Sequence, residues 1–294
     1  MEITATLVKD LRERSGAGMM ECKKALVEAN GDLEAAFDLL RKAGAAKAAK
    51  KAARVAAEGA IVLRQGGDRA VLVEVNSETD FVAKDENFRR FAEAVGDTVL
   101  NSSPADVEAL MNLPLAVAGG AATVEAARAE LVGKIGENIS VRRFVAIPAA
   151  GGIIGSYMHG TKIGVLVVMS GGNPALARDV AMHVAASRPV CVTEDQVPAD
   201  MVAREKAIYM AQAAESGKPA NIVEKMVEGK LKKFLAEISL VGQPFVRDPD
   251  TTVGKLLAAA GAAVKSFVRI EVGEGIEKKT GNFAEEVMAQ ARGA

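Results

Sequence analysis

The spacing of apolar residues at the start of the chain predicts three short helices. Within residues 1–44, apolar side chains recur three or four positions apart, which is the spacing of one helix face. Ser15-Gly16, Asn30-Gly31 and Gly44 interrupt this pattern, and glycine is common directly after a helix. Because three short helices bury little core, we interpret residues 1–44 as a docking module. The Ala- and Lys-rich residues 45–58 then predict a helical linker.

A pattern of two apolar strands and an amphipathic helix occurs twice in the middle of the chain, each time followed by a further apolar strand. The predicted strands are residues 59–63, 70–75 and 140–147 in the first copy, and 152–157, 163–169 and 266–272 in the second. This repetition predicts an α+β fold with a core of two duplicated α/β subdomains and small antiparallel sheets. Core subdomain 1 is assigned to residues 59–148, and core subdomain 2 to residues 149–190 and 240–276. Residues 101–138, which precede the last strand of the first copy, are expected to be mainly helical.

Two helical runs interrupt the second copy. Residues 200–214 and 221–238 each carry apolar side chains at helical spacing, and the sequence Ser216-Gly217-Lys218-Pro219 separates them. We therefore predict an antiparallel helical hairpin, inserted as residues 191–239. Its apolar stripes exceed what one partner helix covers, so the hairpin is expected to meet another chain.

One loop carries an unusual pair of residues. Asp80 is followed by Phe81 between the strand of residues 70–75 and the next helix, in a chain with nine Phe, two Tyr and no Trp. Two interpretations remain open. Asp80 caps the helix while Phe81 packs beneath it, or the turn presents both side chains to a partner.

Composition excludes several classes of protein. The chain has 294 residues, of which 49% are hydrophobic and 26% charged, and its net charge of −1 gives no general bias toward nucleic acid or membrane. Cys22 and Cys191 are far apart, which argues against a disulfide framework and for a reducing, cytoplasmic location. No apolar run approaches the ~18 residues of a membrane helix, and the first residues do not form a secretion signal.

The residues that usually carry catalysis are sparse. His159 and His183 have no Cys or His cluster beside them, so we predict no metal site, and His183 is interpreted as a core residue. The sequence of residues 155–162 resembles a phosphate-binding loop, but its Lys and Thr are in the wrong order and a strand follows. We therefore expect no cofactor and no enzymatic activity, and a protein that acts by binding.

Two other classes of function remain as alternatives. Lys47, Lys50, Lys51 and Arg54 form a basic stretch that suits an RNA-binding accessory factor, but the near-neutral net charge and the lack of an accompanying aromatic or Gly-rich element favour a solvated linker. A small-molecule enzyme built on the duplicated sheets would need a convergent polar pocket.

Two motifs identify a family resemblance. They are LRERSGAGMMECKKAL at residues 11–26 and EVNSETDFVAK at residues 74–84. Weaker matches follow at residues 134–139, 183–187, 224–229 and 271–277. With these motifs the chain closely resembles bacterial elongation factor Ts, the nucleotide exchange factor of the translational GTPase EF-Tu. Residues 101–127 carry no evident motif of that family.

The resemblance implies both a fold and a function. The family has a UBA-like helical module, a two-part core, an inserted coiled-coil hairpin and a C-terminal helical module, here residues 277–294. It binds EF-Tu·GDP and nucleotide-free EF-Tu and promotes GDP release, so that GTP can rebind. Direct nucleic-acid binding is not expected. For the hairpin three arrangements stay open: it makes a homodimer, it packs on EF-Tu, or it does both.

The resemblance also assigns roles to particular residues. Thr79, Asp80, Phe81 and Val82 are implied to disturb the Mg²⁺ and phosphate site of EF-Tu. Contacts with EF-Tu are implied for Arg12, Met19, Met20, His159 and Phe283. For the two methionines a second interpretation stays open, in which they fill the core of the three-helix module.

Overall fold

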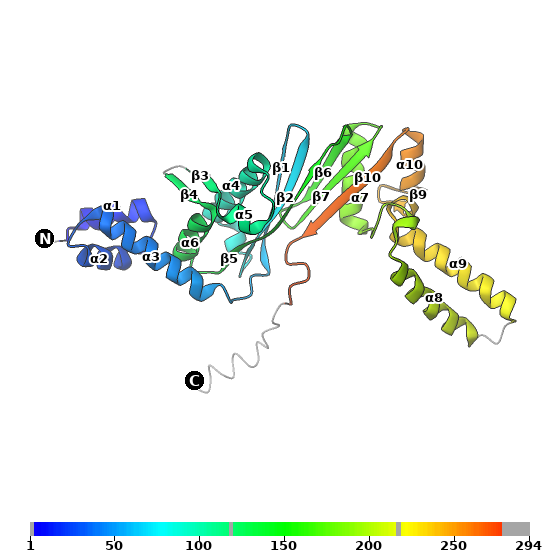
Figure 1. The fold of residues 1–294 in the computed structure, drawn as a ribbon, viewed down its shortest axis with the longest axis horizontal. Coiled ribbons are helices and arrows are strands. Elements are labelled where there is room, and N and C mark those ends of the chain that lie inside the picture. The colour runs from blue at the N-terminus through cyan, green and yellow to red at the C-terminus, as the bar shows by residue number, and fades with distance from the viewer. Residues whose placement is uncertain (1–2, 118–119, 216–218, 278–294) are drawn as a thin grey trace. The chain divides into compact units, whose positions relative to one another are not determined.

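The computed structural model describes residues 3–117, 120–215 and 219–277 (Figure 1). It is a mixed α+β fold with helices at the N-terminal end and several small antiparallel sheets, which confirms the fold class at that level. Its internal contacts divide the chain into two compact units. The first unit is residues 1–62, 73–144 and 271–294, and the second is residues 63–72 and 145–270.

The first unit begins with α1 (Ala5–Ser15), α2 (Met19–Glu28) and α3 (Leu33–Lys51). Side chains cap two of them, because Thr4 accepts a hydrogen bond from the Leu7 N–H and Asp32 accepts from the first turn of α3. The core between the three helices consists of Val8, Leu11, Cys22, Ala25, Leu26 and Ala36.

The predicted end of the third helix at Gly44 is wrong. Helix α3 continues through Gly44 to Lys51, so the Ala- and Lys-rich stretch extends the same helix. Gly44 faces Gly133 of α6 (Val124–Ile135), where an added Cβ on Gly133 would lie 3.1 Å from the Gly44 Cα. The two glycines therefore permit the close approach of two helices, a packing role that outweighs the low helix propensity of glycine.

A three-stranded sheet with the order β1-β2-β5 follows these helices in the chain. Its strands are β1 (Glu58–Gly66), β2 (Arg69–Ser77) and β5 (Ile139–Pro148). Between β2 and β5 the chain forms α4 (Glu86–Ser102), α5 (Val107–Met111), β3 (Pro114–Val117), β4 (Gly120–Thr123) and α6. Strands β3 and β4 pair as an antiparallel hairpin, so the expectation that residues 101–138 are mainly helical is only partly correct. The sequence of this segment lacks helical periodicity, and strand pairing provides hydrogen-bond partners for its backbone N–H and C=O groups.

The second unit contains a sheet with the order β10-β7-β6. Its strands are β6 (Ile153–His159), β7 (Ile163–Ser170) and β10 (Ala263–Glu271), and β6 pairs with β7 as an antiparallel hairpin. Helix α7 (Pro174–Ser187) packs on this hairpin so closely that a Cβ on Gly155 would lie 2.3 Å from the Ala177 backbone. The position therefore requires glycine.

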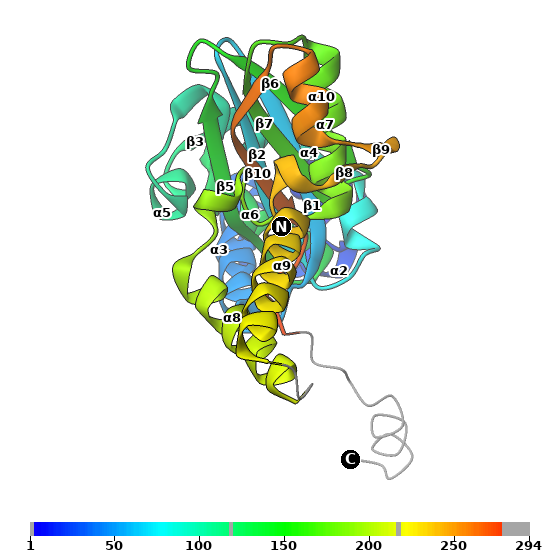
Figure 2. The ribbon, with the colours of Figure 1, turned by 90° about the vertical axis from the view of Figure 1, so that its right-hand side faces the viewer.

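Two further helices follow α7 in the second unit. Helices α8 (Ala199–Ala214) and α9 (Ala220–Ile238) lie side by side (Figure 2). Lys230 of α9 donates a hydrogen bond to Gln212 at 3.1 Å and lies 5.5 Å from the ring centroid of Tyr209, so side chains of the two helices contact each other. The chain then forms β8 (Pro244–Phe245), β9 (Asp248–Thr252) and α10 (Val253–Ala259).

Beyond Glu277, the predicted C-terminal helical module and its residue Phe283 lie outside the described residues. Among the helices that the structure does describe, none combines the length and the apolar character needed to cross a membrane.

His183, interpreted from the sequence as a core residue, is fully buried in α7. Its Nε2 lies 2.9 Å from the side-chain oxygen of Gln243, and its Nδ1 accepts a hydrogen bond from the Val246 N–H at 3.1 Å. Only a neutral imidazole with its proton on Nε2 satisfies both contacts. Burial lowers the pKa of His183 and outweighs the opposing contribution of the Gln243 hydrogen bond.

The buried imidazole predicts a loss of stability in mild acid. In the unfolded chain His183 takes up a proton near pH 6.5, whereas in the folded chain its lowered pKa keeps it neutral at that pH. The free energy of unfolding therefore has its full value above about pH 6.5 and decreases as the pH falls below it. For one proton the slope is at most about 1.4 kcal/mol per pH unit. Urea unfolding between pH 7.5 and pH 5.5 measures this slope.

The second histidine supplies the control for this measurement. His159→Gln should retain the slope, because His159 is exposed, whereas His183→Gln should reduce it even if that variant is less stable throughout. An unchanged slope in His183→Gln would show that other groups cause the acid sensitivity.

Candidate functional site

The candidate site is the Phe81 turn, residues 78–84, which joins β2 to α4. The Phe81 side chain is 79% exposed, an unusual state for an aromatic ring in this chain. Val82 and Ala83, directly after it, are buried within a short 3-10 turn (Val82–Lys84). The backbone is therefore anchored on one side of Phe81 while the ring itself projects into solvent.

Lys84 joins the two neighbouring side chains of the turn. Its Nζ lies 2.7 Å from Oδ2 of Asp80 and 5.8 Å from the centroid of the Phe81 ring. The ammonium group thus offsets the Asp80 charge and faces the ring as in a weak cation–π contact. No role was predicted for Lys84, although its spacing of four residues from Asp80 is a usable signal.

The cap of α4 is a different aspartate from the one considered in the sequence analysis. Asp85 Oδ1 accepts hydrogen bonds from the N–H groups of Asn87 at 2.8 Å and Phe88 at 3.2 Å. Burial by itself would raise the pKa of Asp85, but these hydrogen bonds, assisted by Lys134, lower it overall. The interpretation in which Asp80 caps the helix and Phe81 packs beneath it is therefore wrong, because the 3-10 turn delays the helix start.

The predicted contact residues of the N-terminal helices are exposed. Met19 is 59% and Met20 is 74% exposed at the start of α2, and Arg12 of α1 is also exposed. The interpretation in which both methionines fill the three-helix core is therefore wrong. Val27, which the sequence analysis did not consider, is 57% exposed on the same helix.

The predicted site residues are distributed over both units. The Phe81 turn, Met19 and Met20 belong to the first unit, whereas His159 belongs to the second. His159 is exposed at the end of β6, with its Nδ1 3.5 Å from the Tyr157 hydroxyl.

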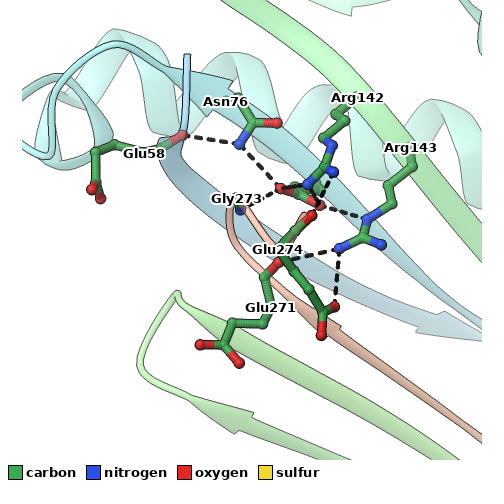
Figure 3. Close-up of polar contacts among 8 residues, drawn as sticks. Glu58, Asn76, Arg142, Arg143, Glu271, Gly273 and Glu274 are labelled. Carbon is green, nitrogen blue, oxygen red and sulfur yellow. Dashed lines mark hydrogen bonds and ion pairs between the residues drawn. The ribbon is translucent and has the colours of Figure 1, made fainter. Parts of the chain in front are cut away.

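A buried charge lies four residues before the Phe81 turn begins. Glu74 of β2 is 0% exposed, and its carboxylate accepts hydrogen bonds from the Gly273 N–H at 2.8 Å and from Arg143 Nε at 2.6 Å. Asn76 and Arg142 each donate to it at 3.1 Å (Figure 3). Burial by itself would raise the pKa of Glu74, but the four donors outweigh it and the pKa is lowered.

The two arginines extend this network toward residues 271–274. Arg143 donates to the carbonyl of Glu271 at 3.1 Å, and Arg142 donates to the carbonyl of Glu274 at 2.6 Å (Figure 3). Glu74 therefore ties this later segment to the first sheet. The single charged residue in the apolar run AVLVEV was a signal that the sequence analysis did not use.

The basic stretch considered for RNA binding is largely engaged within the protein. Lys47 pairs with Glu21, Lys51 donates to the Gly136 carbonyl, and Arg54 lies 3.6 Å from Glu78. These contacts reduce the positive charge available to phosphates. Within the described ranges, no group of three or more His, Cys, Asp or Glu residues is arranged to hold a metal ion.

Comparison with known proteins gives one consistent result. A family profile described as "Elongation factor TS" matches residues 78–274. Elongation factor Ts of Thioalkalivibrio sulfidiphilus is 64% identical over 297 residues, which cover 100% of both chains. The proteins of the same name from Alkalilimnicola ehrlichii and Methylococcus capsulatus are each 60% identical, over 100% and 99% of both chains respectively.

Proposed function

Because the chain belongs to the elongation factor Ts family, whose members exchange the nucleotide on EF-Tu during translation elongation, we propose that the Phe81 turn is the element that opens the nucleotide site. The observation that carries the proposal is the exposed Phe81 ring on an anchored turn. As a member of this family the protein acts by binding and is not an enzyme.

The free energy for exchange comes from binding the GTPase. A nucleotide bound at nanomolar affinity is held by about 12 kcal/mol. An exchange factor that binds nucleotide-free EF-Tu more tightly than EF-Tu·GDP must, by linkage, weaken GDP binding by the same factor. No covalent step is required.

The Phe81 turn acts on the Mg²⁺ and phosphate site of EF-Tu. Mg²⁺ requires nearly ideal octahedral geometry, so a small displacement of its surroundings releases it. Phe81 packs between side chains of the GTPase and supplies this displacement, while Asp80 disfavours negative groups nearby. Thr79 and Val82 support the turn from within, in keeping with their half-buried and buried side chains.

The N-terminal helices supply a second contact with EF-Tu. Met19, Met20 and Arg12 are exposed together on α1 and α2, and flexible thioethers suit an adaptable apolar contact. We assign His159 and Phe283 as further contacts by family resemblance.

Replacing both methionines with serine should weaken the complex without unfolding the protein. Met19 and Met20 are outside the core of the three-helix module, so the Met19→Ser/Met20→Ser variant should keep its unfolding midpoint. Its affinity for EF-Tu should fall by roughly tenfold or more, since the loss of an apolar anchor typically costs more than about 1 kcal/mol. Titration calorimetry with EF-Tu measures the affinity. A variant that unfolds would instead support a structural role.

We also propose, from the family, how the helices and sheets are grouped. We interpret the N-terminal helices as UBA-like, the two three-stranded sheets as a duplicated core, and α8 with α9 as an antiparallel coiled coil. Ile208, Met210 and Ile222 are exposed on that hairpin, which supports a surface for EF-Tu or for a homodimer. We place the protein in the cytoplasm, where EF-Tu functions.

Stopped-flow release of labelled GDP from EF-Tu, with and without this protein, tests the exchange activity. A structure of the complex with nucleotide-free EF-Tu tests the role of the turn. The Phe81 ring should lie against the GTPase near its Mg²⁺ site, and a ring remote from that site would refute the proposal.

A further inference from the structure

The Phe81 turn is held from its N-terminal side by a carboxylate 58 residues away in the sequence. Glu137 Oε2 accepts a hydrogen bond from the Thr79 N–H at 3.0 Å, and Glu137 Oε1 accepts one from the Thr79 hydroxyl at 2.7 Å. Both oxygens of one carboxylate thus bind two donors of one residue, which fixes the position and the orientation of Thr79.

A second hydrogen bond, in the opposite direction, joins the same two segments of the chain. The Glu78 carboxylate accepts a hydrogen bond from the Asn138 N–H at 2.6 Å. Each of the two segments therefore receives a carboxylate from the other, with Glu78 and Thr79 on one side and Glu137 and Asn138 on the other. We call these four residues the cross-clamp.

The cross-clamp is itself anchored. Gly136, in the left-handed conformation with φ of 87°, ends α6 and turns the chain toward β5. The Asn138 side chain donates to the carbonyl of Arg54 at 2.8 Å, and Lys51 donates to the carbonyl of Gly136. The segment that carries Glu137 is thus fixed to the end of α3, and it provides a rigid support for Thr79.

Phe81 lies between two fixed points of the backbone. On one side Thr79 is held by Glu137, and on the other side Val82 and Ala83 are buried. Ser77, the last residue of β2, also donates to the Thr79 carbonyl at 2.8 Å. An exposed ring makes few contacts of its own, so its direction depends on the backbone on either side.

We propose that Glu137 is a positioning residue for nucleotide exchange, which holds Thr79 so that Phe81 is presented to EF-Tu in one orientation. This inference rests on the role proposed above for Phe81. Glu137 acts through the turn and does not itself contact the GTPase. A protein without this support still binds EF-Tu through its other contacts, but its Phe81 ring displaces the Mg²⁺ site less often.

The test compares four proteins by stopped-flow GDP release: wild type, Glu137→Ala, Phe81→Ala and the double variant. Glu137→Ala should lower the maximal release rate by roughly tenfold or more, since a loss of about an ångström in positioning has effects of that size. The concentration of factor that gives half the maximal rate should change little. In the Phe81→Ala background, Glu137→Ala should have almost no further effect, because the two residues act as one unit.

Conservative and matched variants separate positioning from general stability. Glu137→Gln should retain most of the rate, because its carbonyl oxygen accepts from the Thr79 N–H and its amide donates to the Thr79 hydroxyl. Asp179→Ala removes a carboxylate that likewise makes two contacts, both at 2.8 Å with Arg247, and should leave the rate unchanged. If Glu137→Ala does not fold, Thr79→Val keeps the N–H contact with Glu137 but removes the hydroxyl, which donates to Glu137 and accepts from the Val82 N–H at 3.4 Å. The effect of Thr79→Val should likewise vanish in the Phe81→Ala background.

The outcomes distinguish this inference from the proposed function. A Phe81→Ala variant as fast as wild type would refute the proposed function and this inference together. A slow Phe81→Ala beside a normal Glu137→Ala would refute the inference alone. Rate losses that multiply in the double variant would also refute it, because they would show that Glu137 acts independently of Phe81.

Discussion

Replacing Phe81 with alanine is expected to slow GDP release from EF-Tu by about thirtyfold. A buried aromatic anchor at an interface typically contributes about 2 kcal/mol or more, and each 1.4 kcal/mol corresponds to a factor of ten. The ring is 79% exposed in the free protein, so its apolar surface is available for burial against a partner. Stopped-flow measurement at saturating factor reports the effect on release, separately from any loss of affinity.

The same exposure predicts that the variant folds normally. Truncation of an exposed side chain usually changes the free energy of unfolding by less than about 0.5 kcal/mol, so the unfolding midpoint of Phe81→Ala should match that of wild type. Val190→Ala, at another exposed apolar position, serves as the control and should release GDP at the normal rate. If Phe81→Ala releases GDP as fast as wild type, the assignment of the Phe81 turn is wrong.

Replacing Glu74 with alanine is expected to lower the free energy of unfolding by about 3 kcal/mol. Removal of one partner from a buried ion pair costs about 3–5 kcal/mol, because the remaining charges lose their compensation. We take the lower end, since the side chains of Arg142 and Arg143 are 26% and 35% exposed and water can solvate them in part. The Gly273 N–H would lose its acceptor as well. Urea unfolding of the whole protein measures the change.

A surface ion pair provides the control for Glu74. Glu86 pairs with Arg90 one helical turn later, and both side chains are about three-quarters exposed. Glu86→Ala should therefore change the free energy of unfolding by less than about 1 kcal/mol. An equal effect of the two substitutions would show that the Glu74 network does not stabilise the fold.

The lowered pKa of Glu74 makes the free energy of unfolding depend on pH in the acidic range. Its folded pKa lies below the unfolded value of about 4.3, so its stabilisation is complete above that pH and is lost as the pH falls through the folded pKa. Glu74→Gln should reduce the loss of stability in this acidic range. His183 acts in a higher range, below about pH 6.5, so the two effects can be measured separately.

Local sequence patterns predicted much of the secondary structure. The apolar periodicity of α1, α2 and α4 depends on neighbours three or four positions away, and the strands of both sheets follow from short apolar runs. The hairpin of α8 and α9 was predicted in the same way. The segment of β3 and β4 was missed, because its Ala- and Gly-rich sequence has no clear period.

Part of the candidate site was also visible in the sequence. The Asp80-Phe81 pair and the exposed methionines come from two motifs that are specific to one family, and the comparisons confirm that family. The supporting residues were not found. Glu74 stands out as the single charge in an apolar run, and Glu137 lies in the weaker family match of residues 134–139, but nothing local indicates which donors they meet.

The sequence by itself determined most of the helices and strands, the family and the presence of an aromatic residue in the loop after β2. Tertiary structure alone decided that Gly44 lies within a helix against Gly133 and that Glu137 holds Thr79. The physical reason is the range of the interactions. Periodicity and capping act within one or two helical turns, whereas close packing and buried charge depend on segments that meet only when the chain is folded.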